Sequence, residues 1–234
     1  MTPDPVLRVA DPSGPVRGVA VVLHGGRAHG TGPVSARQLA VLRMLPFARA
    51  LERAGAADGL AVARLRYGVR GWNGARQSPV ADTRWALDEL ERRYPGVPVA
   101  LVGHSMGGRT AIYVAGHENV RAVVGLAPWI EAGDPYQQLA GRRVLFVHGT
   151  NDRMTSARAA AEFARSSAGV AASMSFVRIR NDGHPMLRRP GIWHELAAGF
   201  VTAVLLGRSP EGTAGSDTTN VLTQVLAGEA LLVV

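Results

Sequence analysis

The segment Gly103-His104-Ser105-Met106-Gly107 constrains the fold of this chain more than any other. It follows the apolar run Val97–Val102 and precedes a helix-compatible stretch, Gly108–Ala115. A G-x-S-x-G pattern between a strand and a helix is typical of a sharp turn that lifts a strained serine above a sheet. The chain has 28 glycines, so the context matters more than the pattern alone. Glycine is needed at both ends of the pentapeptide, because a Cβ there would clash in so tight a turn.

Apolar, strand-like runs alternate with longer helical stretches along the chain. The continuous apolar run Val19–Leu23 is typical of a strand that is buried on both faces. Such alternation predicts a parallel sheet with helices on both faces, and ligand sites at the carboxyl ends of its strands. Strands are expected over Val16–Leu23, Leu60–Leu65, Val97–Val102, Arg121–Leu126, Arg143–Val147 and Met174–Ile179, and helices over Ser35–Ala54, Pro79–Tyr94, Gly108–Ala115, Thr155–Ser166 and Ile192–Leu206.

Composition narrows the class of protein. A chain of 234 residues with 47% hydrophobic residues fits one α/β domain with a large core. No apolar run approaches the roughly 20 residues of a membrane span, and the first residues lack the layout of a signal peptide. We therefore expect a cytoplasmic protein with no membrane partner. The absence of cysteine excludes disulfides, thiolate metal sites and cysteine nucleophiles.

The formal charge of +8 raises the question of a nucleic-acid partner. All 26 basic residues are arginine, and they are scattered along the chain in nothing longer than doublets such as Arg92-Arg93. Nucleic-acid-binding proteins usually cluster their positive charge. We expect no nucleic-acid partner and attribute the charge to compositional bias.

The chain changes character near residue 207. Residues 1–207 show no internal repeat and no linker, so they are expected to form one domain. Residues 208–220 are rich in Gly, Ser, Thr and Pro and predict a flexible segment. The apolar tail Val221–Val234 is too short to span a bilayer. It is expected either to dock on the body or on a second subunit as a small helix and strand, or to remain a surface tail.

Two loops that follow strands supply the partners that a serine nucleophile requires. A serine hydroxyl needs a base to accept its proton and a third group to orient that base. In this turn architecture the chain order is serine, acid, histidine. Asp152 follows one strand in the loop H-G-T-N-D, and His184 follows the next in the loop R-N-D-G-H. We expect Asp152 to orient His184, and His184 to serve Ser105 first as general base and then as general acid.

Other residues compete for these roles. Asp134 is a rival acid, and Asp152 is preferred because its loop leaves a strand directly. Asp152 has an alternative role as a cap of the helix that starts near Thr155. Asp182 is expected to be a turn residue. Of the seven histidines, only His184 is both the last one to follow a strand and C-terminal to the acid.

The oxyanion of an acyl-transfer intermediate needs two backbone N–H donors. The residue after the nucleophile, Met106, is expected to supply one of them. The loop after the first strand, which contains His24-Gly25-Gly26, is expected to supply the other from Gly26. The alternative is that the glycine pair only makes a turn.

These motifs together resemble the α/β-hydrolase superfamily, in its small bacterial form related to serine hydrolases and dienelactone hydrolases. The resemblance covers roughly residues 5 to 207, and Leu65–Asn73 matches the family's Y-R-G-x-G loop only in part. It implies an α/β-hydrolase fold over residues 1–207, with a mostly parallel central sheet and helices on both faces. Many members carry a helical lid where this chain has only residues 127–142, so a minimal lid or none is expected.

The resemblance implies a carboxylesterase-like serine hydrolase that acts through an acyl-serine intermediate with a Ser-His-Asp triad. It implies no metal or organic cofactor, a small acyl molecule as substrate, and a monomer or homodimer. An acyltransferase or thioesterase on the same triad, or a non-catalytic binding protein with this fold, remains the alternative. The open site is expected to be bordered by side chains that equally well pack under loops, namely His24, Tyr67, Trp72, Trp129, Met154 and Met186.

Overall fold

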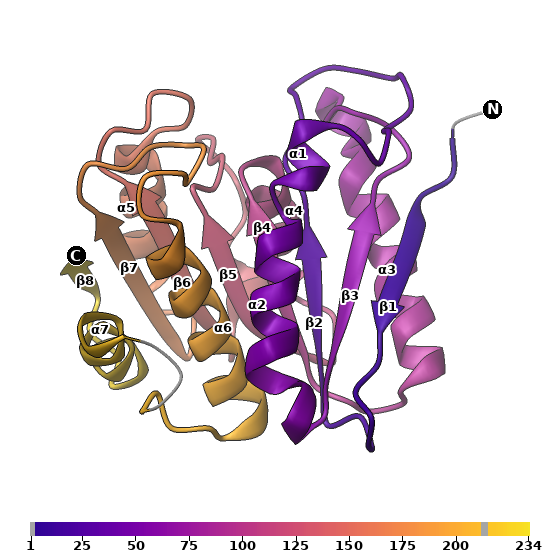
Figure 1. The fold of residues 1–234 in the computed structure, drawn as a ribbon. Helices are drawn as coiled ribbons and strands as arrows, with labels where there is room; N and C mark the ends of the chain where they lie inside the picture. The colour runs from indigo at the N-terminus through magenta and orange to yellow at the C-terminus, as the bar shows by residue number, and fades with distance from the viewer. Residues whose placement is uncertain (1–2, 212–214) are drawn as a thin grey trace.

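The computed structural model describes residues 3–211 and 215–234, and the described strands form one eight-stranded sheet (Figure 1). The strand order is β1-β3-β2-β4-β5-β6-β7-β8, with β1 antiparallel to β3 and every other pair parallel. The predicted mostly parallel sheet is thus confirmed. The strands are β1 Val6–Ala10, β2 Gly18–Leu23, β3 Leu60–Arg66, β4 Val99–His104, β5 Val120–Leu126, β6 Arg143–Gly149, β7 Ser173–Ile179 and β8 Leu231–Val233.

Helices cover both faces of the sheet, as the alternating pattern predicts (Figure 1). One buried cluster joins α2, α6 and α7 to one face of the sheet, and a second joins α3, α4 and α5 to the other. The helices are α1 Leu39–Leu42, α2 Leu45–Gly55, α3 Ser78–Arg93, α4 Met106–Val114, α5 Ala157–Ser167, α6 Pro190–Leu206 and α7 Ser216–Leu226, with short 3₁₀ turns at η1 Ala56–Asp58, η2 Gly74–Arg76 and η3 Gln137–Leu139.

The central strands pack against helices on both faces of the sheet. Every residue of β2 is buried, with Val21 in the cluster on one face and Val22 in the cluster on the other. The register then sets which loops meet at the carboxyl edge. Leu23 of β2 pairs with Gly103 of β4, and Gly149 of β6 pairs with Ile179 of β7. The loops after β2 and β4 therefore start side by side, and so do the loops after β6 and β7.

Two elements differ from the prediction. The single helix expected over residues 35–54 is wrong, because α1 ends at Leu42 and α2 begins at Leu45. Pro46 lies in the first turn of α2. In a continuous helix its ring would clash with the carbonyl of Leu42, four residues earlier. Strand β1 is not predicted at all, since it is a five-residue edge strand interrupted by the exposed Arg8.

The C-terminal segment docks on the body of the molecule. Strand β8 extends the sheet beside β7, and α7 packs against α6. The helix begins at Ser216, so residues 216–220 of the segment expected to be flexible are helical; residues 212–214 of that segment lie outside the described residues. Thr218, Leu222 and Val225 are buried at helical spacing. The apolar face of the tail therefore extends back into the polar stretch.

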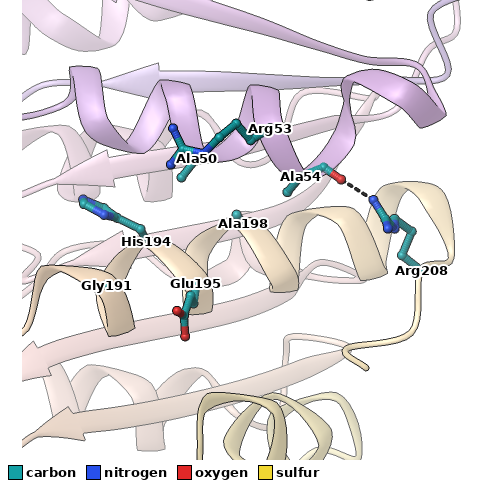
Figure 2. A pocket seen from close by; sticks show the side chains of 8 residues that line it. All are labelled: Ala50, Arg53, Ala54, Gly191, His194, Glu195, Ala198 and Arg208. Atoms are coloured by element: carbon teal, nitrogen blue, oxygen red, sulfur yellow. Dashed lines mark hydrogen bonds between the residues drawn. The ribbon is translucent and has the colours of Figure 1, made fainter. Parts of the chain in front are cut away.

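Small side chains meet along the α2–α6 seam and leave a cavity of about 350 Å³ there (Figure 2). Arg208, at the end of α6, reaches across this seam. Its guanidinium donates to the carbonyl of Ala54 and pairs with Asp58 at 2.9 Å. A cation at this position is favourable near the C-terminal end of α2, where it satisfies the carbonyl of Ala54. In the described part of the chain, no helix combines the length and apolar character needed to cross a membrane.

Candidate functional site

Ser105 sits in the sharp turn that its glycine neighbours predict. Its φ of 54° and ψ of −116° lie outside the helical and extended regions, directly before α4. A Cβ on Gly103 would lie 2.2 Å from the carbonyl oxygen of Gly107, and one on Gly107 would lie 2.4 Å from that of Leu23. Strain of this kind persists only where the surroundings enforce it. The Ser105 hydroxyl makes no hydrogen bond to any other described residue, so it is available for chemistry.

Asp152 and His184 meet at the carboxyl edge of the sheet. They lie on the loops after β6 and β7, and Asp152 Oδ2 is 2.9 Å from His184 Nδ1. The Asp152 side chain is fully buried, and its Oδ1 accepts the amides of Met154 at 2.8 Å and Thr155 at 3.0 Å. This arrangement fixes the carboxylate and leaves the Nε2 side of the His184 ring for a substrate or a nucleophile.

The Asp152 carboxylate stays charged in this buried position. Burial by itself raises the pKa of a carboxyl group. Here hydrogen bonds from His148, His184 and the amides of Thr155 and Met154 outweigh burial and hold the pKa of Asp152 well below its usual range. A permanently charged acceptor at His184 Nδ1 favours the tautomer whose Nε2 is free to accept a proton.

His148 contacts the candidate acid and was not singled out from the sequence. It is the next-to-last residue of β6, is fully buried, and its Nε2 lies 3.1 Å from the same Asp152 oxygen that contacts His184. Its Nδ1 has no partner among the described residues, so the ring proton belongs on Nε2, facing the carboxylate. Thr155 adds a third donor, with its hydroxyl 2.9 Å from that oxygen. The only feature of the sequence that could have indicated this contact is that His148 lies four residues before Asp152.

His104, inside the serine turn, fixes the loop of the candidate base. Its Nε2 donates to the backbone carbonyl of His184 at 3.0 Å, and the two rings lie 4.6 Å apart. Burial is the largest cause that lowers the pKa of His104 to about 3, and the neighbouring His184 adds to it. His104 is therefore a neutral donor that ties the serine turn to the histidine loop.

The rival residues have other partners. Asp134 binds Arg109 at 2.6 Å and the Tyr113 hydroxyl at 2.8 Å, and it contacts no histidine in the described part of the chain. Asp182 accepts from the Trp193 indole at 2.9 Å and from the amide of Arg189 at 3.0 Å, so it stabilises the start of α6.

The cap of α5 is likewise a different residue from the candidate acid. The Ser156 hydroxyl accepts the amide of Ala159 and caps the helix. Asp152 does not cap α5, and its Oδ2 faces the two histidines. The structure brings together the acid and base that the chain order singled out and assigns structural partners to Asp134 and Asp182.

The two candidate oxyanion donors lie on neighbouring loops. The Met106 amide opens α4, where amides lack an intrahelical partner, and the Gly26 amide donates to no other described residue. A Cβ on Gly26 would lie 2.3 Å from Met106 Cε and 2.6 Å from the carbonyl oxygen of Arg70. Glycine at this position is thus required for the close approach of the two loops.

His24 braces the loop that carries Gly26. Its Nδ1 donates to the carbonyl of Gly25 at 2.6 Å, and its Nε2 accepts the amide of Tyr67 at 3.2 Å. Burial lowers the pKa of His24 to about 4, and the charge of Arg66 contributes in the same direction. A neutral ring can therefore donate and accept at once and join the loops after β2 and β3.

The buried neutral histidines predict a loss of stability in acid. Their pKa values are lower in the folded protein than in the unfolded chain, so this stability is complete above about pH 6.5 and falls as the pH drops toward 4 for His24 and 3 for His104. At pH 5 we expect each to cost about 2 kcal/mol relative to pH 8. Urea unfolding at the two pH values measures the difference. His104→Gln should reduce it and exposed His29→Asn should not; equal stability at both pH values would contradict the prediction.

Two cavities are lined by residues of the loops that follow β2 and β3. The first, the oxyanion-side cavity, has a volume of about 480 Å³ and is lined by His24, Gly25, Gly26 and the apolar Leu39 among others. The second, the tryptophan cavity, has a volume of about 370 Å³. It is lined by Trp72, Trp129, Arg109, Tyr113 and Glu131 among others.

Arg109 organises the tryptophan cavity. Its guanidinium carbon lies 4.3 Å from the ring centre of Trp72 and 4.5 Å from that of Trp129. Stacking of this kind holds a cation and two aromatic rings in a fixed arrangement. The cavity wall is therefore rigid.

The expected pocket residues divide between wall and core. His24, Trp72 and Trp129 line the two cavities. Tyr67 and Met186 are buried, at 0% and 2% exposure, and line neither cavity. Both side chains belong to the core clusters, which is the alternative that the sequence left open for them. Met154 is 78% exposed and lies on neither wall.

The site is open, as predicted from its short lid region. Residues 127–142 carry only the turn η3, so no helical lid covers Ser105. Among the described residues, no group of three or more His, Asp or Glu side chains is arranged to hold a metal ion.

Comparison with known proteins identifies the fold. A family model described as the alpha/beta hydrolase fold matches residues 66–172. No curated protein matches the chain. Among solved structures, an α/β serine hydrolase homologue from Coxiella burnetii shares 18% identity over 83% of this chain and 90% of its own, with a TM-score of 0.59.

Two further structures are similar over most of their length. Est1E from Butyrivibrio proteoclasticus, solved with ferulic acid, shares 15% identity over 86% of this chain and 95% of its own, with a TM-score of 0.64. A lidless α/β serine hydrolase from Xanthomonas campestris shares 17% identity over 82% and 86%, with a TM-score of 0.60. The chain thus has the α/β-hydrolase fold, and its structural neighbours include serine hydrolases and esterases.

Proposed function

We propose that this protein is a serine hydrolase that cleaves a carboxylic ester of a small acyl group, with Ser105 as nucleophile, His184 as base and Asp152 as the orienting acid. The observation that carries the proposal is the 2.9 Å contact between Asp152 and His184 at the edge where the strained Ser105 is presented. A serine hydroxyl without another described partner, on the sheet edge that also carries an oriented imidazole, suits covalent acyl transfer.

The proposed reaction has two halves. Ser105 Oγ attacks the ester carbonyl carbon while its proton passes to His184 Nε2. The amides of Gly26 and Met106 donate to the oxygen that gains negative charge. His184 then gives its proton to the departing alcohol, which leaves an acyl-serine. Water attacks this intermediate while His184 takes the proton from that water. His184 then returns the proton to Ser105 Oγ as the acyl–oxygen bond breaks, which releases the carboxylic acid and free Ser105.

The oxyanion-side cavity suits the acyl group of the substrate. It begins at the proposed oxyanion donor Gly26, and Val34, Leu39 and Ala40 form an apolar wall. A cavity of about 480 Å³ open to solvent fits a small acyl group. The bound ferulic acid of the structural neighbour Est1E supports a substrate of this size.

A panel of acyl compounds tests the proposed function. We expect p-nitrophenyl esters to be turned over, with the highest kcat/KM for short acyl chains that fit inside the oxyanion-side cavity. A fluorophosphonate should inhibit this activity and label the protein once. Amides and thioesters of the same acyl groups compare the leaving groups. If the folded protein turns over none of these compounds and takes up no label, it is a binding protein and the proposal fails.

His148 is expected to position the acid and so to set the pH dependence of turnover. His148→Phe removes one donor from Asp152 Oδ2, and the unshared carboxylate then stabilises the charged form of His184 more strongly. We expect the acidic limb of the kcat profile to move to higher pH by up to about one unit. In His148→Gln an amide N–H can replace the ring donor, so this variant should move the limb less. Identical pH profiles of kcat for the wild type and both variants would show that His148 does not position Asp152 for catalysis.

A further inference from the structure

A fourth cavity lies near the β1 edge of the sheet, and Ser105 does not line it. It has a volume of about 250 Å³ and is lined by residues of β1, β3 and the α1–α2 region, including Arg8, Arg64 and Arg66. Figure 1 shows β1 at the edge of the sheet with β3 next to it, and α1 and α2 on the face of the sheet nearer the viewer. Arg8 pairs directly with Arg64 across the antiparallel ladder, and Arg66 follows two residues later on the same face. We call this the arginine cavity.

The three arginines carry positive charge without a counter-charge. No Asp or Glu lines the arginine cavity. Arg8 and Arg64 make no side-chain hydrogen bond or ion pair with any other described residue, and Arg66 donates only to the carbonyl of Val34. Arg64 is half-buried. Like charges directly opposite on paired strands are destabilising, and a partly buried charge is costly without a partner. An anion bound between the guanidinium groups would offset both costs.

The remaining walls of the arginine cavity are apolar. Val6, Val41, Met44 and Leu65 line it beside the arginines. A guanidinium matches a carboxylate with two parallel hydrogen bonds, and apolar walls favour a hydrocarbon group. The ligand chemistry that fits both features is a carboxylate that carries a short hydrocarbon tail.

The arginine cavity shares one wall with the candidate catalytic site. His24 lines it, and the same side chain holds the carbonyl of Gly25 in the oxyanion loop. We propose that the arginine cavity binds an amphipathic carboxylate, held by Arg8 and Arg64 at its head and by the apolar walls along its tail. Binding requires no turnover, so it can be tested whether or not Ser105 is a nucleophile.

Calorimetric titration with octanoate tests the proposal. Wild-type protein and Ser105→Ala should bind octanoate at one saturable site with the same affinity. Arg8→Gln/Arg64→Gln should weaken binding at least tenfold. The matched control Arg49→Gln/Arg84→Gln loses the same charge from exposed arginines on α2 and α3 and should bind like the wild type. Octanol, which lacks the charge, should bind the wild type more weakly than octanoate does. Its affinity for the wild type and for both double variants should be the same.

Stability provides a second readout. Without ligand, the Arg8→Gln/Arg64→Gln variant should unfold at the same urea concentration as the wild type or a higher one, because the change removes repulsion. Octanoate should raise the midpoint of the wild type but not that of the variant. Should the double variant fail to fold, Arg8→Gln alone alters only an exposed side chain and should still weaken binding.

Three results would overturn the proposal. The first is equal octanoate affinity in the wild type and the Arg8→Gln/Arg64→Gln variant, which would place the ligand elsewhere. The second is equal weakening in the Arg49→Gln/Arg84→Gln control, which would reflect net charge alone. The third is displacement of octanoate by an equal concentration of inorganic phosphate, which would show that the apolar walls contribute nothing.

Discussion

Replacing Ser105 with alanine should abolish both ester turnover and covalent labelling by a fluorophosphonate. The alanine variant keeps the cavities and the Asp152–His184 pair but has no oxygen to attack the carbonyl. The expected loss in kcat is on the order of 10⁶-fold, because removal of the nucleophile disables the whole catalytic group. Intact-mass measurement after exposure to the probe gives the labelling stoichiometry, and a fluorogenic ester gives the rate.

The matched control is Ser13→Ala, which removes an exposed hydroxyl far along the chain from the strained turn. It should be labelled and should turn over ester like the wild type. Circular dichroism of both variants checks that they are folded. Stoichiometric labelling of folded Ser105→Ala would show that another residue is the nucleophile.

The second large effect is expected from Asp152→Asn. The Asp152 oxygen Oδ2 faces the ring nitrogens of His184 and His148, while Oδ1 is held by two backbone amides. An asparagine would keep its oxygen on those amides and turn its NH₂ group toward the rings. His184 would then have to accept at Nδ1 and carry its proton on Nε2, where it cannot take a proton from Ser105. We expect kcat to fall about 10⁴-fold with little change in KM.

Two control variants test whether the loss of activity is specific to Asp152. Asp88→Asn alters an exposed carboxylate and should leave kcat unchanged. Asp134→Asn tests the rival acid. It should lower stability, because Asp134 is buried against Arg109, and it should retain the triad chemistry in the folded fraction. If folded Asp134→Asn is inactive while Asp152→Asn is active, the acid is assigned to the wrong residue.

The sequence predicted those parts of the molecule that follow from local pattern. The apolar runs located the central strands, and the turn around Ser105 was predictable because only glycine fits at its two ends. Asp152 and His184 could be singled out because each follows a strand, and parallel strands bring their carboxyl ends to one edge. In the observed register Gly149 of β6 lies opposite Ile179 of β7, so the loops that carry Asp152 and His184 start side by side.

The parts that escaped prediction depend on contacts between distant residues. Arg109 and Asp134 form a buried pair although they are 25 positions apart, and nothing local marks either as buried. His148 was hidden because the same H-G dipeptide occurs after β2. The edge strand β1 has too little apolar pattern of its own and is defined by its pairing with β3. For Tyr67 the sequence left both a place on the site wall and a place in the core open, because a short loop sequence does not indicate which side chains turn inward; Tyr67 is fully buried.

The open oxyanion-side cavity has a consequence for the evolution of substrate range. Leu39, on its apolar wall, is 76% exposed and belongs to the four-residue helix α1, which is outside the central sheet. Substitutions at exposed positions usually change stability by less than about 0.5 kcal/mol. Substitutions in this wall should therefore cost little stability, whereas substitutions of Asp152, His148 or the glycines of the serine turn should cost much more. Descendants of such a chain could acquire new substrates in single mutational steps, with the buried acid and its two histidines inherited intact.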